Sequence, residues 1–158
     1  MNGVQYTQET VLNPSGLVAY GSLFGTSVDI DGDVIVVGAP GDTGSAEDSG
    51  AAHIYRHNGE AWVHEQKVFA AVGSSSGPVA VSGDVVAVGR HLFRYDGVGS
   101  WVAEPALTDA QGAPFTLNGA VDLDGDVLYD IEEKVFPDIK AEPGQKAFIF
   151  IHTVPYEG

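Results

Sequence analysis

The chain has no cysteine among its 158 residues. A disulfide framework, a thiolate metal site and a cysteine nucleophile are therefore excluded. No apolar run approaches the length of about 18 residues that a membrane helix needs. The N-terminus has no basic region followed by an apolar stretch of the kind found in signal peptides. With 44% hydrophobic residues, the chain still has enough apolar side chains to fold around a core.

Basic residues are also scarce. Seven Lys and Arg stand against 22 Asp and Glu, which gives a formal net charge of −15. Nucleic acid and anionic membrane surfaces are therefore not expected as partners, because both attract basic proteins. The acidic residues are spread along the chain. This is typical of a solubilising surface, and it leaves open the recognition of cations or basic partners.

No stretch has the periodicity of an amphipathic helix. Apolar residues instead alternate with polar ones at a period of two, and 21 Gly and 8 Pro interrupt these stretches. Such a pattern is typical of short strands joined by turns, so we predict an all-β protein.

One short motif recurs three times. The sequence VDIDGDVI at residues 28–35 returns as VAVSGDVV at 79–86 and as VDLDGDVL at 121–128. Each copy predicts two strands joined by a tight hairpin turn, because glycine after Asp or Ser adopts a positive φ at little cost.

A second pattern follows the hairpin and also recurs. HIYR at residues 53–56 is echoed by HLFR at residues 91–94. An aromatic residue, a glutamate three positions later and an apolar residue three further on then occur at 62–68 and 101–107. The same spacing occurs at the start of the chain, over residues 6–12. A complete unit therefore has four strands, and its last strand also has a lone copy at the N-terminus.

These repeats predict a β-propeller with three blades of four antiparallel strands, within a single domain of residues 1–158. The blades span about residues 23–68, 77–107 and 115–152. The third blade lacks its fourth strand, and we expect a strand at residues 4–12 to complete it, in this chain or in a neighbouring one. The other strands are predicted near residues 25–30, 33–38, 51–56, 61–68, 78–82, 84–88, 91–95, 101–107, 117–123, 126–130 and 146–152.

Three blades are few for a propeller, which usually closes a ring of about four to eight. An incomplete ring would expose the apolar faces that blades bury on each other. We therefore expect self-association into a homodimer that forms a six-bladed ring with two-fold symmetry. A fragment of a longer propeller and a closed three-blade barrel are the alternatives.

The first blade resembles the FG-GAP repeat. LFGTSV at residues 23–28 is followed by DGD at 31–33 and VVGAP at 36–40, and GAAHIYR at 50–56 also fits that family. The other two blades keep the hairpin but lose the signature pairs. The resemblance implies a β-propeller like that of integrin α-chain heads, an extracellular or cell-surface location, and a non-catalytic role in binding or assembly.

The resemblance also implies where ligands bind. In such propellers the loops between the second and third strands, and between blades, form the recognition face. Loops on a rigid scaffold commonly carry function, so we expect a protein or glycan ligand there, with a solvated acidic loop as the alternative. The acidic residues of these loops are Asp42, Glu47 and Asp48 in the first blade, and Glu132, Glu133, Asp138 and Glu142 in the third.

Blades of this family often bind calcium in the loop between their first two strands. The resemblance makes Ca²⁺ the only cofactor to consider, with two sets of candidate carboxylates: Asp29, Asp31 and Asp33, and Asp122, Asp124 and Asp126. Calcium needs about six to eight oxygen ligands, and these hairpins are too short to wrap an ion. Solvated turn acids are the alternative that we favour, with weak cation binding left open.

No catalytic motif is convincing. GSSSG at residues 73–77 matches G-x-S-x-G, but a strand is predicted after it where the nucleophile elbow needs a helix. His53 and His91 occupy equivalent places in the repeat, which favours a structural role over metal binding. Trp62 and Trp101 also match, which favours packing between blades over stacking on sugars.

We therefore predict that the chain is not an enzyme. The alternatives are a propeller lyase or hydrolase acting on a glycan, and a structural repeat fragment of a larger surface protein.

Overall fold

The computed structural model describes residues 7–15, 21–42, 50–70, 78–89, 91–105, 120–124, 127–132 and 146–151. These residues form eleven strands in three antiparallel sheets, and they contain no helix. The all-β prediction is therefore confirmed for the described part of the chain.

The first sheet has four strands in sequence order: β1 (Val28–Asp31), β2 (Val34–Ala39), β3 (Ala51–His57) and β4 (Trp62–Phe69). The β1–β2 hairpin turns at Asp-Gly as predicted, and the φ of Gly32 is 55°. That value lies in the left-handed region, which glycine enters without steric cost.

The second sheet repeats this order with β5 (Val79–Ser82), β6 (Val85–Val88), β7 (His91–Tyr95) and β8 (Trp101–Ala103). The third sheet has three strands, in the order β11-β10-β9. They are β9 (Ala120–Asp124), β10 (Val127–Glu132) and β11 (Lys146–Ile151). Each sheet matches a predicted unit. The shorter β8 is the main difference, because residues 104 and 105 lie outside the strand.

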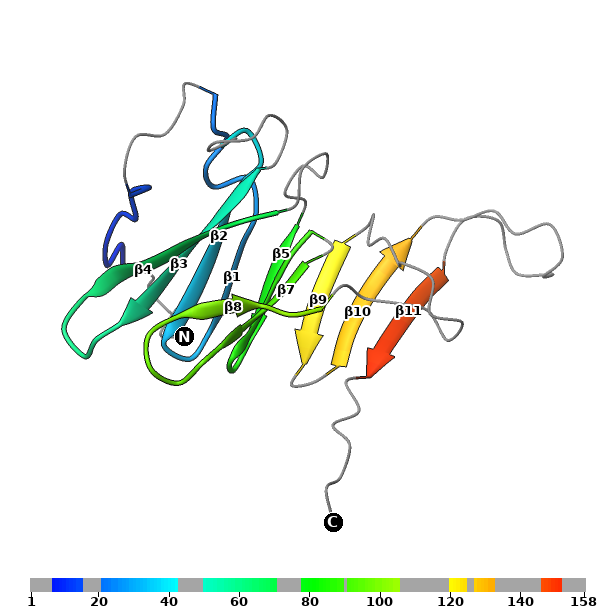
Figure 1. The fold of residues 1–158 in the computed structure, drawn as a ribbon. Coiled ribbons are helices and arrows are strands. Elements are labelled where there is room, and N and C mark those ends of the chain that lie inside the picture. The colour runs from blue at the N-terminus through cyan, green and yellow to red at the C-terminus, as the bar shows by residue number, and fades with distance from the viewer. Residues whose placement is uncertain are drawn as a thin grey trace, which may run out of the picture.

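The three sheets lie side by side, and neighbouring sheets contact each other through their first strands, as Figure 1 shows. β1 and β2 pack against β5, and β5 packs against β9. This arrangement of four-stranded antiparallel sheets is consistent with propeller blades.

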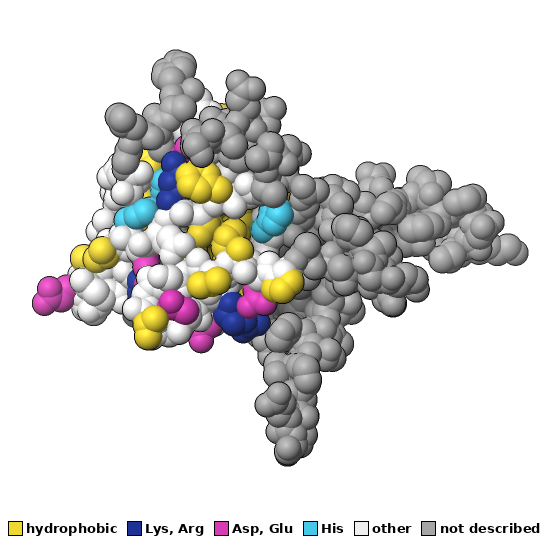
Figure 2. Space-filling view, viewed as in Figure 1, with side chains coloured by type: hydrophobic (Ala, Val, Ile, Leu, Met, Phe, Trp, Pro, Cys, Tyr) yellow, Lys and Arg dark blue, Asp and Glu magenta, His cyan; other side chains and the backbone are white. Residues whose placement is uncertain are grey.

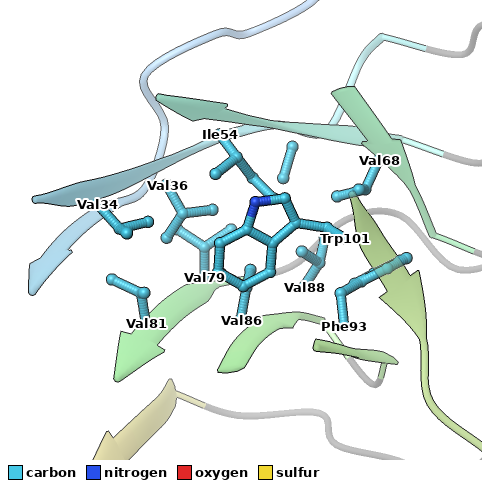
Figure 3. Packing of buried hydrophobic residues seen from close by; sticks show 11 residues of the cluster. Val34, Val36, Ile54, Val68, Val79, Val81, Val86, Val88, Phe93 and Trp101 are labelled. Carbon is cyan, nitrogen blue, oxygen red and sulfur yellow. The ribbon is translucent and has the colours of Figure 1, made fainter. Parts of the chain in front are cut away.

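The core lies between the first and second sheets (Figure 3). Valines of β5 and β6 meet valines of β2, and Ile54 of β3 closes the cluster from the first sheet. Trp101 of β8 lies in the same cluster and is only 3% exposed. The prediction that Trp101 packs between blades is confirmed. On the described surface in Figure 2, further apolar side chains lie among the charged ones.

The N-terminal segment differs from its prediction. Residues 7–15 form no strand, and they lie beside the first sheet, on the side away from the other two (Figure 1). The Tyr55 hydroxyl donates to the Asn13 carbonyl at 2.6 Å, and Trp62 Nε1 donates to Glu9 Oε1 at 3.1 Å. A strand at residues 7–12 that completes the third sheet of the same chain is therefore wrong, because contacts with the first sheet hold this segment elsewhere. Residues 4–6 lie outside the described part, and donation of this strand to a neighbouring chain stays a prediction.

Candidate functional site

The residues that signal the FG-GAP repeat have structural roles. The Gly25 N–H donates to the Gly38 carbonyl, and the Gly38 N–H donates to the Ser27 carbonyl, both at 2.9 Å. The Phe24 ring meets the His53 ring edge-on, with centroids 5.3 Å apart. A Cβ atom on Gly38 would collide with the Ser27 hydroxyl. The motif therefore fixes the entry into β1 against the end of β2.

The first two candidate calcium ligands join the first sheet to the second. Asp29 Oδ2 accepts the Val81 N–H at 2.8 Å, and Asp31 Oδ2 accepts the Gly83 N–H at 2.7 Å. Hydrogen bonds from backbone N–H to an ionised carboxylate are among the stronger ones in proteins. Both side chains therefore hold the β5–β6 hairpin against β1.

The third acid of this set is directed elsewhere. Asp33 accepts from Arg56 Nη1 at 3.3 Å. Among the residues that the structure describes, no group of three or more His, Cys, Asp or Glu could hold a metal ion. The side chains of Asp122 and Asp124, and the whole of Asp126, lie outside the described part. Calcium binding stays a prediction, and the first hairpin gives it no geometric support.

Asp42 lies in a buried charged cluster at the start of the β2–β3 loop. Its side chain accepts from Lys67 Nζ at 2.6 Å and lies 3.4 Å from His53 Nε2. His53 Nδ1 lies 3.1 Å from His64 Nε2. Asp42 is only 2% exposed. Asp42 is therefore not a solvated loop acid, because pairing with Lys67 compensates the cost of burying its charge. Its role in ligand binding stays a prediction.

Sequence reasoning missed Lys67 and His53 as partners of Asp42, and His64 as the partner of His53. The signal was the pairing of the third and fourth strands, which places His53 directly opposite Lys67. Side chains of paired residues lie on one face of a sheet and interact. The register therefore places the Lys67 side chain beside His53, near the loop that follows β2.

The other predicted loop acids lie outside the described part of the chain, wholly or with their side chains. Glu132 is the last residue of β10, and its side chain lies outside the described part. Outside it as well are Glu47, Asp48, Glu133, Asp138 and Glu142. Their role in ligand binding stays a prediction. Residues 73–77, which carry the G-x-S-x-G pattern, also lie there.

Burial shifts the proton affinity of three groups in this region. It lowers the pKa of His53 below its usual value, although the hydrogen bond with Asp42 opposes the shift. Burial also lowers the pKa of His64, and the nearby Lys67 charge adds to the effect. Burial raises the pKa of Tyr55 to about 12.

The two histidines predict a loss of stability on acidification. A folded-state pKa below the unfolded one means that the unfolded chain binds more protons as pH falls through about 6.5. Each histidine then removes up to about 1.4 kcal/mol of unfolding free energy per pH unit. We expect denaturant unfolding at pH 7.5, 6.5 and 5.5 to show a smaller loss in His53→Gln than in the wild type.

The control is His57→Gln, which changes a histidine at the far end of β3. Protonation also reduces the repulsion within a chain of net charge −15, which stabilises every variant at low pH. The test therefore compares the pH dependence of the unfolding free energy between the variants. Equal pH slopes for the wild type and His53→Gln would contradict the prediction.

The antiparallel sheets and their hairpin contacts are consistent with a repeat module of the β-propeller type. Residues 6–55 match the family model of the FG-GAP repeat, so the chain contains an FG-GAP repeat. The match begins in the N-terminal segment and ends in β3. No curated protein matches the chain. No helix in the described residues is long and apolar enough to cross a membrane.

Proposed function

We propose that this chain is a non-catalytic recognition module of an extracellular or cell-surface protein, and that its β2–β3 loop face binds a ligand with cationic groups. The observation that carries this proposal is the buried pair of Asp42 and Lys67, which fixes the start of the loop on the sheet. A loop anchored at its base loses less conformational entropy when it binds a ligand.

The charge of the loop supports a cationic ligand. Glu47 and Asp48 follow Asp42 in the sequence, on a chain of net charge −15. Electrostatic attraction speeds association with cationic groups and disfavours anionic competitors. FG-GAP repeats occur in extracellular and surface proteins, which agrees with the proposed location.

The test uses matched probes that differ in charge. Chitosan oligosaccharides carry free amines, whereas their fully acetylated counterparts are neutral. A lysine–glycine peptide and its acetylated form make a second pair. We expect the wild type to bind at least one cationic probe, and Glu47→Gln/Asp48→Asn to bind it about tenfold more weakly.

The control variant is Glu60→Gln/Asp84→Asn, which removes the same charge from the exposed β3–β4 and β5–β6 turns. These turns lie at the opposite end of the sheets from the β2–β3 loop. No binding to either cationic probe, or equal losses in both variants, would overturn the proposed ligand face. Cleavage of chitosan by the wild type would overturn the non-catalytic role.

A further inference from the structure

The first strand of the first sheet exposes an apolar face that its counterparts bury. Ile30, Val81 and Leu123 hold the same place in β1, β5 and β9, because each pairs with the second residue of the following strand. Val81 is 3% exposed and Leu123 is 8% exposed, whereas Ile30 is 57% exposed. Val28 is also 64% exposed, while its counterpart Val79 is buried.

The difference follows from the preceding sheet. Val79 and Val81 pack against Val34 and Val36 of the first sheet, in the shared core. β9 likewise packs against β5. No sheet in the described part of the chain precedes the first one, so Val28 and Ile30 have no such cover. This face of β1 corresponds to the face of β5 that packs on the first sheet, but no sheet in the described part of the chain packs on it.

A tryptophan–glutamate hydrogen bond that recurs in the first two sheets indicates what packs beside the first sheet. Trp101 of the second sheet donates from Nε1 to Glu65 Oε2 of the first sheet at 2.8 Å. Trp62, its counterpart in the first sheet, donates in the same way to Glu9 at 3.1 Å. Glu9 and Glu65 also share the aromatic-x-x-Glu spacing of a fourth strand. Residues 7–12 therefore occupy the place of a fourth strand in a preceding sheet, and the described part of the chain contains no other strand of that sheet.

The third sheet has the three strands that this place lacks. It consists of β9, β10 and β11, and in the described part of the chain no fourth strand pairs with β11. Asp122 and Asp124 hold the register positions in β9 that Asp29 and Asp31 hold in β1. In the second sheet, Ala80 and Ser82 stand at these positions. The third sheet therefore has aspartates at the two positions from which Asp29 and Asp31 of the first sheet bind the backbone of the second sheet.

We propose that the third sheet of a second copy of this chain packs on the β1 face of the first sheet, and that residues 7–12 pair with β11 of that copy as its fourth strand. The chain's own third sheet lies on the far side of the second sheet (Figure 1), so it does not cover this face. Asp122 and Asp124 of β9 in the second copy then stand in the place relative to β1 that Asp29 and Asp31 of β1 have relative to β5. Two such contacts, related by a two-fold axis, close a ring of six blades. The inference does not depend on the ligand proposed above.

Light scattering of the full chain tests the assembly. We expect a mass of twice 16.5 kDa at micromolar concentration. Ile30→Glu places a charge in the proposed interface but on an exposed position of the monomer, and we expect it to weaken dimerisation by about 100-fold or more. Val98→Glu is the control, since Val98 is exposed in the β7–β8 turn. Circular dichroism checks that both variants stay folded. A monomeric wild type, or a dimer that Ile30→Glu leaves intact, would overturn the proposal.

A mixing experiment tests which face each copy contributes. Asp122→Lys/Asp124→Lys should also dissociate the dimer, because it alters the third sheet. Mixing it with Ile30→Glu should restore dimers, since the unaltered third sheet of one chain meets the unaltered first sheet of the other. A dimer that Asp122→Lys/Asp124→Lys does not affect would show that two first sheets meet, and it would overturn the proposal. Mixed variants that stay monomeric would do the same.

Discussion

Replacing Trp101 by alanine is expected to lower the free energy of unfolding by about 3–5 kcal/mol. The indole is almost fully buried among the valines of both sheets, so its removal leaves a cavity in their shared core (Figure 3). The Nε1 hydrogen bond to Glu65 is lost with it, and that carboxylate is partly buried. Glu65 keeps its hydrogen bond from Arg56 on Oε1, but Oε2 loses a donor in a partly buried place, which adds a desolvation cost.

The matched control is Trp62→Ala. Trp62 has the same place in the repeat, but it is only partly buried and contacts Glu9 and the His57 ring. We expect this change to cost about 1 kcal/mol, because little apolar area is uncovered. Urea unfolding of the wild type and both variants measures the difference. Equal losses would mean that Trp101 does not hold the two sheets together.

Much of the fold could be predicted because its signals are local. The Asp-Gly and Ser-Gly turns and the period-two alternation place the hairpins of all three sheets. Equivalent positions in the repeat then identify Trp101 as a packing residue. Each of these inferences needs only neighbouring residues and the geometry of one strand pair.

The roles of the acids could not be predicted in the same way. Asp29 and Asp31 bind backbone N–H groups of the neighbouring sheet. Every residue except proline carries such a group, so no sequence pattern distinguishes these partners. Asp42 stands at the start of a Gly- and Ser-rich stretch that resembles a solvated loop. Its burial depends on Lys67, which lies two strands further along the chain.

The buried pair of Asp42 and Lys67 gives the second large prediction. Asp42→Asn leaves the Lys67 ammonium without its carboxylate, beside His53 and His64 at the base of the loop. Breaking a buried ion pair by removing one partner typically costs about 3–5 kcal/mol. The Lys67 side chain keeps 20% of its exposure, so solvent screens part of that charge. We therefore expect a loss of about 2–4 kcal/mol in unfolding free energy.

A double-mutant cycle separates the unpaired charge from the loss of contacts. In Asp42→Asn/Lys67→Met both charges are absent, so no desolvated ion remains without a partner. We expect the double variant to be more stable than Asp42→Asn, and the two single losses to sum to more than the double loss. Additive losses would show that the two groups contribute independently and that burial of the pair has no energetic role.

The exposed pair of Asp33 and Arg56 serves as the comparison within the same sheet. The Asp33 side chain is 60% exposed, so water screens its attraction to the guanidinium. Arg56 also keeps its 2.8 Å hydrogen bond to Glu65 when Asp33 is changed. Asp33→Asn should therefore cost at most about 0.5 kcal/mol, because exposed ion pairs contribute little. The contrast with Asp42→Asn then follows from burial, since each variant removes one carboxylate charge from a pair with a basic side chain.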